Sequence, residues 1–318
     1  MVKELKRYFK DKKNFFLHDF LGGSEVGRNI SRYMTSKLGV YLRTIQDSEI
    51  YKRLSFPVIL NSIPKAGTNL LLNVVLQLPG TFLQDEIVIY NLKSNWQIWG
   101  LEALSISSRF YYSLVERKVY NLLPGKVYVG HNPYTSDVAK FIDRWKLKHI
   151  LIIRDPRDYI VSLTYFVGYG KNYIRRPAYD QFNSHDEKLL ASIVGIGEGK
   201  FSLSLTKYSV PNVKILYESY EGWLNHKNTL IIRYEDFVGE DGISPNIKET
   251  IGRILNYLEV EPTNDIIAKM INEGMKPEKS HTFRKGRAGE WKKEFKEIHF
   301  EAFEKIGGVE ILKKFGYL

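Results

Sequence analysis

Four short apolar runs occur along the chain, and segments with a helical repeat of apolar residues lie beyond them. The runs are FPVILNS (56–62), KVYVGH (126–131), KHILIIR (148–154) and NTLIIRYE (228–235). Continuous apolar runs of this length are typical of parallel strands that are covered on both faces. The repeat predicts helices in segments 67–78, 135–145, 155–166 and 244–258. The alternation predicts an α/β fold with a doubly wound, mostly parallel sheet flanked by helices.

The pattern divides the chain into an extension and one domain. We expect residues 1–55 to form a helical or irregular N-terminal extension and residues 56–318 to form a single domain. Within this domain, segments 80–125 and 167–225 lack the alternation and are rich in aromatic residues. Long insertions of this kind often form lids or substrate pockets. Because ligands of doubly wound sheets bind at the carboxyl ends of the strands, we expect the functional site there.

Composition and charge narrow the choice of partners. The chain has 318 residues, of which 43% are hydrophobic, and its formal net charge is +11. An excess of this size favours anionic partners such as nucleotides, acidic lipids, polyanionic substrates or nucleic acid. No RNA-recognition, zinc-finger or helix-turn-helix signature accompanies the charge, so nucleic acid is not the expected partner.

Several classes of chemistry are excluded or not expected. The chain has no cysteine, which excludes a disulfide framework, a thiolate nucleophile and thiolate ligands for zinc. No apolar run approaches the roughly 20 residues of a membrane span, and MVKELKRYFKDKKNFF at the start lacks the apolar core of a secretory signal. We therefore expect no transmembrane segment and a cytoplasmic location. No cluster of carboxylates or histidines has the spacing of metal ligands, so no metal is predicted.

The stretch SIPKAGTNLL (62–71) follows the first strand and has the composition of an anion-binding turn. A strand that enters a glycine-containing turn and then a helix points several backbone N–H groups at one position, where the helix dipole adds positive charge. Lys65 adds a full charge, and Thr68 and Asn69 add side-chain donors. The arrangement is P-loop-like, but Lys65 precedes Gly67, whereas the lysine of an NTP-binding loop follows its glycines.

Two further segments carry candidate anion ligands. Arg154 ends the third predicted strand, and Ser162 lies eight residues later, about two turns into the next helix. That helix begins beside the strand end, with Asp155 suited to its N-cap and Pro156 to its first position. Arg154 and Ser162 could therefore meet one phosphate, for which the rigid fork of arginine is suited. The segment TFRKGRAGEW (282–291) mixes glycine with basic residues, a composition typical of an anion-binding loop.

Together these segments resemble the sulfotransferases that use 3′-phosphoadenosine 5′-phosphosulfate. PKAGTNLL (64–71) looks like their 5′-phosphosulfate loop, RDPRDYIVS (154–162) like their 3′-phosphate motif, and FRKGRAGEWKKEF (283–295) like their R-K-G-x-x-G-[DE]-W-K element. The order along the chain is the same, and RYEDF (233–237) is similar to the segment after a later strand of the family. The resemblance covers about residues 56–318 and implies this co-substrate, the product adenosine 3′,5′-bisphosphate and no metal.

Carried over by position, the resemblance gives each motif a part of the co-substrate. The residues implied for the 5′-phosphosulfate are Lys65, Ala66, Gly67, Thr68 and Asn69. Those implied for the 3′-phosphate are Arg154 and Ser162, with Arg284, Lys285 and Gly286 closing over it. Tyr234 falls on the tyrosine that contacts adenine in the family. The position of Lys65 is then explained, because a lysine at the start of the turn can reach the bridging oxygen and the sulfuryl group.

Transfer of a sulfuryl group to a hydroxyl or amine also needs a base for the acceptor proton, and histidine is suited to this near neutral pH. His131 ends the second strand in GHNP (130–133), which resembles the T-H-x-P segment that carries the family's base. We therefore expect His131 and Lys65 to be the catalytic residues. His281, before the third motif, is the second candidate for the base, whereas His149 opens a strand at the opposite edge of the sheet.

The chain departs from the family pattern at several positions. Leu70 replaces a tryptophan after the 5′ loop, Asn69 stands where threonine or serine is usual, and Val129 replaces a lysine two residues before the base. Lys65 is then the single cation assigned to the sulfuryl group. The family's C-terminal dimer motif is not visible, so no oligomeric state is predicted.

Three functions remain open. The leading one is a sulfotransferase, and its aromatic insertions favour a small apolar or planar acceptor or a cation, with a sugar as an alternative. A nucleotide-dependent kinase would need a lysine late in the turn and a Mg²⁺ carboxylate at a strand end, and the sequence offers neither convincingly. A non-catalytic module that binds acidic polymers would explain the charge but not the basic residues at strand ends.

Overall fold

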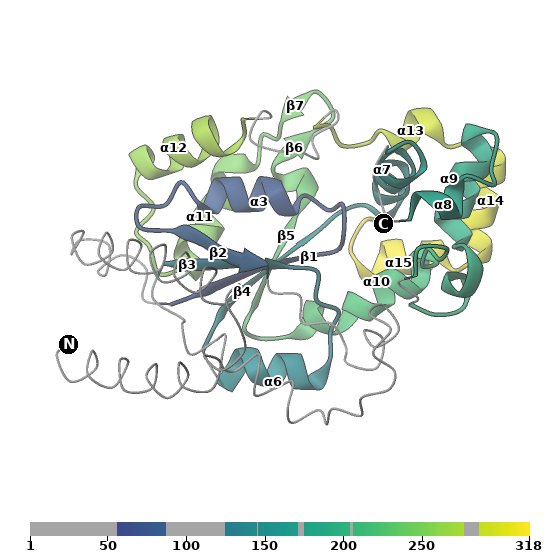
Figure 1. Ribbon diagram of the computed structural model, residues 1–318. Helices are drawn as coiled ribbons and strands as arrows, with labels where there is room; N and C mark the ends of the chain where they lie inside the picture. The colour runs from purple at the N-terminus through teal and green to yellow at the C-terminus, as the bar shows by residue number, and fades with distance from the viewer. Residues whose placement is uncertain (1–55, 87–124, 145, 171–174, 204–205, 277–285) are drawn as a thin grey trace, which may run out of the picture. The chain divides into compact units, whose positions relative to one another are not determined.

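The computed structural model of the chain describes residues 56–86, 125–144, 146–170, 175–203, 206–276 and 286–318 (Figure 1). The predicted N-terminal extension and most of the first aromatic insertion lie outside the described residues. Both therefore stay predictions, whereas the second insertion is described over most of its length.

Within the described residues, five parallel strands form the central sheet. They are β1 (Val58–Ser62), β2 (Phe82–Glu86), β3 (Lys126–Gly130), β4 (Lys148–Ile153) and β5 (Thr229–Arg233), in the order β2-β3-β1-β4-β5. β1 pairs with β3 on one side and with β4 on the other. The strand order therefore reverses at β1, and its carboxyl end lies at the crevice where doubly wound sheets bind ligands.

Helices cover both faces of the sheet. Alternate residues of β1 show this, because Val58 and Leu60 pack into one core cluster and Ile59 packs into the other. The helices on the first face are α3 (Thr68–Val75), α11 (Ile247–Tyr257) and α12 (Asn264–Gly274). Those on the second are α6 (Ser136–Arg144) and α10 (Val213–Glu221). α7 (Pro156–Gly168) packs into the same core cluster and lies beyond the carboxyl ends of the strands. β1 and β4 are thus covered on both faces, as their continuous apolar runs predict.

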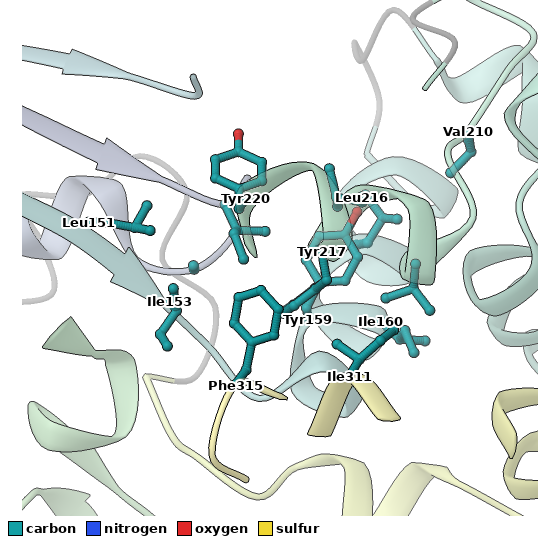
Figure 2. Packing of buried hydrophobic residues seen from close by; sticks show 14 of the residues in the cluster. Leu151, Ile153, Tyr159, Ile160, Val210, Leu216, Tyr217, Tyr220, Ile311 and Phe315 are labelled. Carbon is teal, nitrogen blue, oxygen red and sulfur yellow. The ribbon is translucent and has the colours of Figure 1, made fainter. Parts of the chain in front are cut away.

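The core cluster of the second face extends past the carboxyl ends of the strands. The other helices that contribute to it are α8 (Arg176–Tyr179), α9 (His185–Val194), α13 (Trp291–Glu294), α14 (Glu297–Lys305) and α15 (Gly308–Lys314). Figure 2 shows Tyr217 of α10 in this cluster, near Tyr159 and Phe315. The centroid of the Tyr217 ring is 5.7 Å from that of Tyr159 and 5.1 Å from that of Phe315. The end of the chain is thereby packed against α7 and α10.

The remaining regular elements are short. They are the antiparallel pair β6 (Val238–Gly239) and β7 (Gly242–Ile243) and the 3-10 helices Gly197–Lys200, Gly222–Asn225 and Tyr234–Asp236. Among the described helices, none combines the length and the apolar character needed to cross a membrane.

The predicted α/β class with a doubly wound parallel sheet is confirmed. Each apolar run contains a strand, and α3, α6 and α11 lie in the predicted helical segments. α7 begins in its predicted segment and ends two residues beyond it, at Gly168. Asp155 caps α7 by accepting from the backbone N–H of Arg157 at 2.8 Å, and Pro156 is the first residue of the helix, both as predicted. The apolar pattern misses β2, because its sequence FLQDE is only partly apolar. β2 is an edge strand of the described sheet, and edge strands need no continuous apolar run.

His149 lies near the amino end of β4, on the side of the sheet predicted from its position. It is fully buried, and its Nδ1 atom is 2.8 Å from Oγ1 of Thr229. Its ring packs against Trp223 with 4.4 Å between the centroids. Burial, with His226 as a second cause, lowers the pKa of His149 from 6.5 to about 3. This histidine is therefore neutral in the folded protein near neutral pH.

We expect His149 to make the fold sensitive to acid. Below pH 6.5 the unfolded chain binds a proton at this residue that the folded protein does not bind, so the free energy of unfolding falls as the pH drops from 6.5 towards 3. The limit for one such group is about 1.4 kcal/mol per pH unit. His149→Gln removes the titrating group and keeps an amide that can bond Thr229. Urea unfolding at neutral and acidic pH should therefore show a smaller decrease in the free energy of unfolding for the variant than for the unmodified protein. Equal losses in the two proteins would rule out this source of acid sensitivity.

Candidate functional site

The turn between β1 and α3 contains two residues in left-handed conformations. Lys65 has a φ angle of 65° and Gly67 one of 103°. Glycine is required at position 67 for a second reason, because a Cβ atom there would lie 2.7 Å from Cδ2 of the Tyr234 ring. Gly67 caps α3 without a side-chain hydrogen bond. The first N–H groups of a helix have no acceptor within it, so this turn directs them and the helix dipole at one position suited to an anion.

The side chain of Lys65 lies against α7. Its Nζ atom is 3.6 Å from the centroid of the Phe166 ring, which is a cation–π distance. Ser162 is half-buried one turn before Phe166, and residues four apart share a face of a helix. Ser162 and Lys65 are therefore on the same side of α7.

Arg154 directly follows β4 and connects segments that are far apart in the sequence. Its guanidinium donates to the carbonyl oxygen of Lys65 at 3.4 Å and to that of Arg287 at 3.2 Å. The same group lies 4.3 Å from the centroid of the Tyr234 ring. Arg154 is only 7% exposed, and its Nε atom is buried without a hydrogen-bond partner among the described residues. A buried donor of this kind is suited to an anionic ligand.

Asp158, in the first turn of α7, fixes the third motif segment. Its carboxylate is buried and accepts from the backbone N–H of Gly289 at 2.7 Å and from that of Trp291 at 3.0 Å. Burial raises the pKa of Asp158, and the charge of Arg154, whose Nη2 atom lies 3.8 Å away, opposes this rise. The sequence does not signal this role of Asp158, because Gly289 and Trp291 lie 131 and 133 positions later in the chain.

Glu235 ties the end of the chain to the same side of the sheet. Its carboxylate accepts from the backbone N–H of Asp155 at 3.0 Å and from the hydroxyl of Tyr317 at 3.0 Å. Burial is the main cause that raises the pKa of Glu235 to about 7. The segments that follow β4 and β5 are thereby linked beside Arg154 and Tyr234.

His131 directly follows β3 and is half-buried beside the end of β1. Its Nδ1 atom lies 2.9 Å from Oγ of Ser62 and 3.0 Å from the carbonyl oxygen of Ser62. Next to it, the side chain of Asn61 accepts from the backbone N–H of Asn132 at 2.7 Å and donates to the Asn132 carbonyl at 2.9 Å. The backbone pairing of β1 with β3 ends at Asn61 and Gly130. The Asn61 side chain extends this pairing to Asn132 and so holds His131 at the carboxyl end of the sheet.

The other candidates divide into described and undescribed residues. Ala66 is buried in the turn, and Asn69 is half-buried in the first turn of α3. Gly286 begins the described part of the third segment with a φ angle of 60°. The candidates outside the described residues are Arg284, Lys285 and His281. Among the described residues, no three His, Asp or Glu side chains are grouped as metal ligands.

Known proteins resemble this chain in sequence family and in fold. The family model described as "Sulfotransferase domain" matches residues 56–316. Sulfotransferase 2A1 of Mus musculus is 23% identical over 268 residues, which cover 78% of this chain and 82% of the relative. Heparan sulfate 2-O-sulfotransferase 1 of Homo sapiens is 28% identical over 152 residues, which cover 48% of this chain and 40% of the relative. The crystal structure of mouse sulfotransferase SULT7A1 complexed with PAP has a TM-score of 0.55 and 18% identity, covering 81% of this chain and 85% of that chain, and it bears on the fold alone.

Proposed function

The chain belongs to the sulfotransferase domain family, and we propose that it moves a sulfuryl group from 3′-phosphoadenosine 5′-phosphosulfate to a hydroxyl or amine of a small-molecule acceptor. The transfer is in line and leaves adenosine 3′,5′-bisphosphate. The domain boundary at residue 56 and a cytoplasmic location are parts of the same proposal.

The observation that carries the proposal is the position of Arg154. Its guanidinium contacts the backbone of the Lys65 turn, the ring of Tyr234 and the backbone of Arg287. These are the segments assigned to the 5′-phosphosulfate, the adenine and the 3′-phosphate. A single ligand with an anionic group at each end would account for why these segments converge, and the buried Nε of Arg154 is suited to one of those groups.

The proposed binding roles follow the motif assignments. The N-terminus of α3, with Thr68 and Asn69, holds the 5′-phosphosulfate, and Arg154 and Ser162 hold the 3′-phosphate. Arg284, Lys285 and Gly286 close over the 3′-phosphate, and Asp158 supports them by fixing Gly289 and Trp291. Tyr234 contacts the adenine. Catalysis then consists of positioning and stabilisation of charge.

The proposed catalytic residues are Lys65 and His131. Lys65 carries its charge at the turn, so its Nζ atom can leave the Phe166 ring and stabilise the charge that develops on the bridging oxygen. His131 lies at the neighbouring strand end and removes the proton of the acceptor as the new bond to sulfur forms.

Aromatic side chains near Lys65 support the proposed class of acceptor. Phe166 of α7 contacts Lys65, and the exposed Tyr169 directly follows the end of this helix. The Tyr169 ring packs against Tyr165 at 5.6 Å and His185 at 5.8 Å between centroids. Rings of this kind favour planar or apolar molecules, or cations held against them. One matching relative is named for heparan sulfate, so a sugar is the alternative acceptor.

Transfer of labelled sulfate from the donor to a panel of phenols, alcohols, amines and glycans tests the proposal. We expect a labelled product from a member of the small-molecule classes, formed equally well in EDTA, because no metal takes part. Labelling of glycans alone would shift the acceptor to sugars. Phosphate transfer from ATP that requires Mg²⁺ would favour a kinase. Binding of acidic polymers without any transfer would favour a non-catalytic module.

A further inference from the structure

A chain of three side chains connects the proposed base to the proposed sulfuryl-binding turn. His131 Nδ1 lies 2.9 Å from Ser62 Oγ, and Ser62 Oγ lies 2.5 Å from Thr68 Oγ1. Ser62 is the last residue of β1 and is fully buried. It stands before the PKAGTNLL motif, so the motif gives it no role.

The hydrogens of this chain have one consistent direction. The carbonyl oxygen of Ser62, 3.0 Å from His131 Nδ1, can only accept a hydrogen bond, so Nδ1 carries a hydrogen. Ser62 Oγ then accepts from Nδ1 as well. Because Ser62 is fully buried and Thr68 Oγ1 is the other partner of this hydroxyl among the described residues, we assign the Ser62 hydrogen to the bond with Thr68 Oγ1. The hydroxyl hydrogen of Thr68 is consequently directed away from Ser62, at the N-terminus of α3.

We propose that Ser62 is a positioning residue for the transfer: it holds His131 in the tautomer whose Nε2 accepts the proton, and it orients the Thr68 hydroxyl as a donor to the phosphosulfate. This inference rests on the proposed function, in particular on His131 as the base. A neutral imidazole carries one hydrogen, so a hydrogen on Nδ1 leaves the lone pair on Nε2.

The same contacts act during the reaction. The acceptor atom forms a bond to sulfur and gives its proton to His131 Nε2, while the bond between sulfur and the bridging oxygen breaks and its electron pair stays with the leaving phosphate. The resulting imidazolium still donates from Nδ1 to the two oxygens of Ser62, which stabilise its charge. Ser62 thus supports the base before and after the proton is transferred.

The test compares Ser62→Ala with the unmodified protein. The variant keeps the carbonyl oxygen and loses only the hydroxyl, so we expect kcat to fall roughly tenfold, about the effect of one hydrogen bond. The affinity for adenosine 3′,5′-bisphosphate should change by less than about threefold, because the backbone donors of α3 remain. In the variant Nδ1 loses one of its two acceptors and keeps the carbonyl oxygen, so nitrogen NMR of labelled His131 should show a larger population with the hydrogen on Nε2 than in the unmodified protein. An unchanged tautomer ratio in this variant would overturn the inference about the Ser62 hydroxyl, whatever the activity of the variant.

Two controls separate this role from simpler ones. Ser192 is also a fully buried serine whose hydroxyl bonds other side chains, Thr164 at 2.6 Å and Tyr179 at 2.7 Å. Ser192→Ala should therefore lose stability without a change in kcat or in the His131 spectrum, and an equal loss of kcat there would overturn the specific role of Ser62. Full activity in His131→Ala would refute the proposed base, whereas an inactive His131→Ala beside a fully active Ser62→Ala would refute the role of Ser62 alone.

Discussion

Lys65→Ala should reduce kcat by roughly a hundredfold to a thousandfold, which is the usual effect of removing one preorganised donor from a site of developing charge. The sequence assigns no second cation to the sulfuryl group, because Val129 stands where the family has another lysine. Lys65 Nζ contacts the Phe166 ring, and its loss should cost the fold about 0.5–1 kcal/mol. The protein should therefore stay folded, and kcat at saturating donor and acceptor is the measurement.

Two variants make this result specific. Lys65→Arg keeps the charge but replaces a compact ammonium with a planar fork, so we expect activity between that of the alanine variant and that of the unmodified protein. Lys140→Ala removes a lysine from the exposed side of α6 and should leave kcat unchanged. A kcat of Lys65→Ala within tenfold of the unmodified protein would remove Lys65 from the catalytic residues.

The layout of the sheet is predictable because most of its strands are covered on both faces. That environment requires consecutive apolar residues, so β1, β3 and β4 stand out in the sequence. β5 lies at one edge of the described sheet and is mostly half-buried, but its sequence TLIIR is apolar enough to be recognised. β2 lies at an edge of the described sheet and is only partly apolar, and no pattern marks it. Short polar strands of this kind form because a neighbour, here β3, offers backbone partners.

The candidate site is predictable only in its local parts. The turn at Lys65 and the cap at Asp155 depend on neighbouring residues, so the sequence indicates both. The motif assigns Arg154 to a phosphate, but its contacts with Lys65, Tyr234 and Arg287 depend on how distant segments pack. The same holds for Ser62, whose partner His131 is 69 positions away. Contacts between residues so far apart in the sequence follow from the tertiary fold and leave no periodic signal in the sequence.

The 3′-phosphate should account for most of the nucleotide affinity. A charge-assisted hydrogen bond contributes roughly 1.5–3 kcal/mol, and two or three such bonds, discounted for solvent and non-additivity, amount to about 3–5 kcal/mol, or two to three orders of magnitude in affinity. Adenosine 3′,5′-bisphosphate should therefore bind far more tightly than AMP, which lacks only this phosphate. A ligand at 100 times its dissociation constant stabilises a fold by about 2.7 kcal/mol, so thermal unfolding should shift clearly with the bisphosphate and little with AMP.

Arg154→Ala should remove most of this difference by weakening the bisphosphate and leaving AMP nearly unchanged. The variant also loses the bonds to Lys65 and Arg287 and so loses stability, which is why the ratio of the two affinities is the quantity to compare. Arg157→Ala is the matched control, because Arg157 lies at the same helix start but binds Asp155 at 2.6 Å and stacks on Trp291 at 3.8 Å. Its affinity ratio should stay that of the unmodified protein. If the unmodified protein bound the two nucleotides equally, Arg154 would not be a phosphate ligand, and the convergence of the three motif segments would need another explanation.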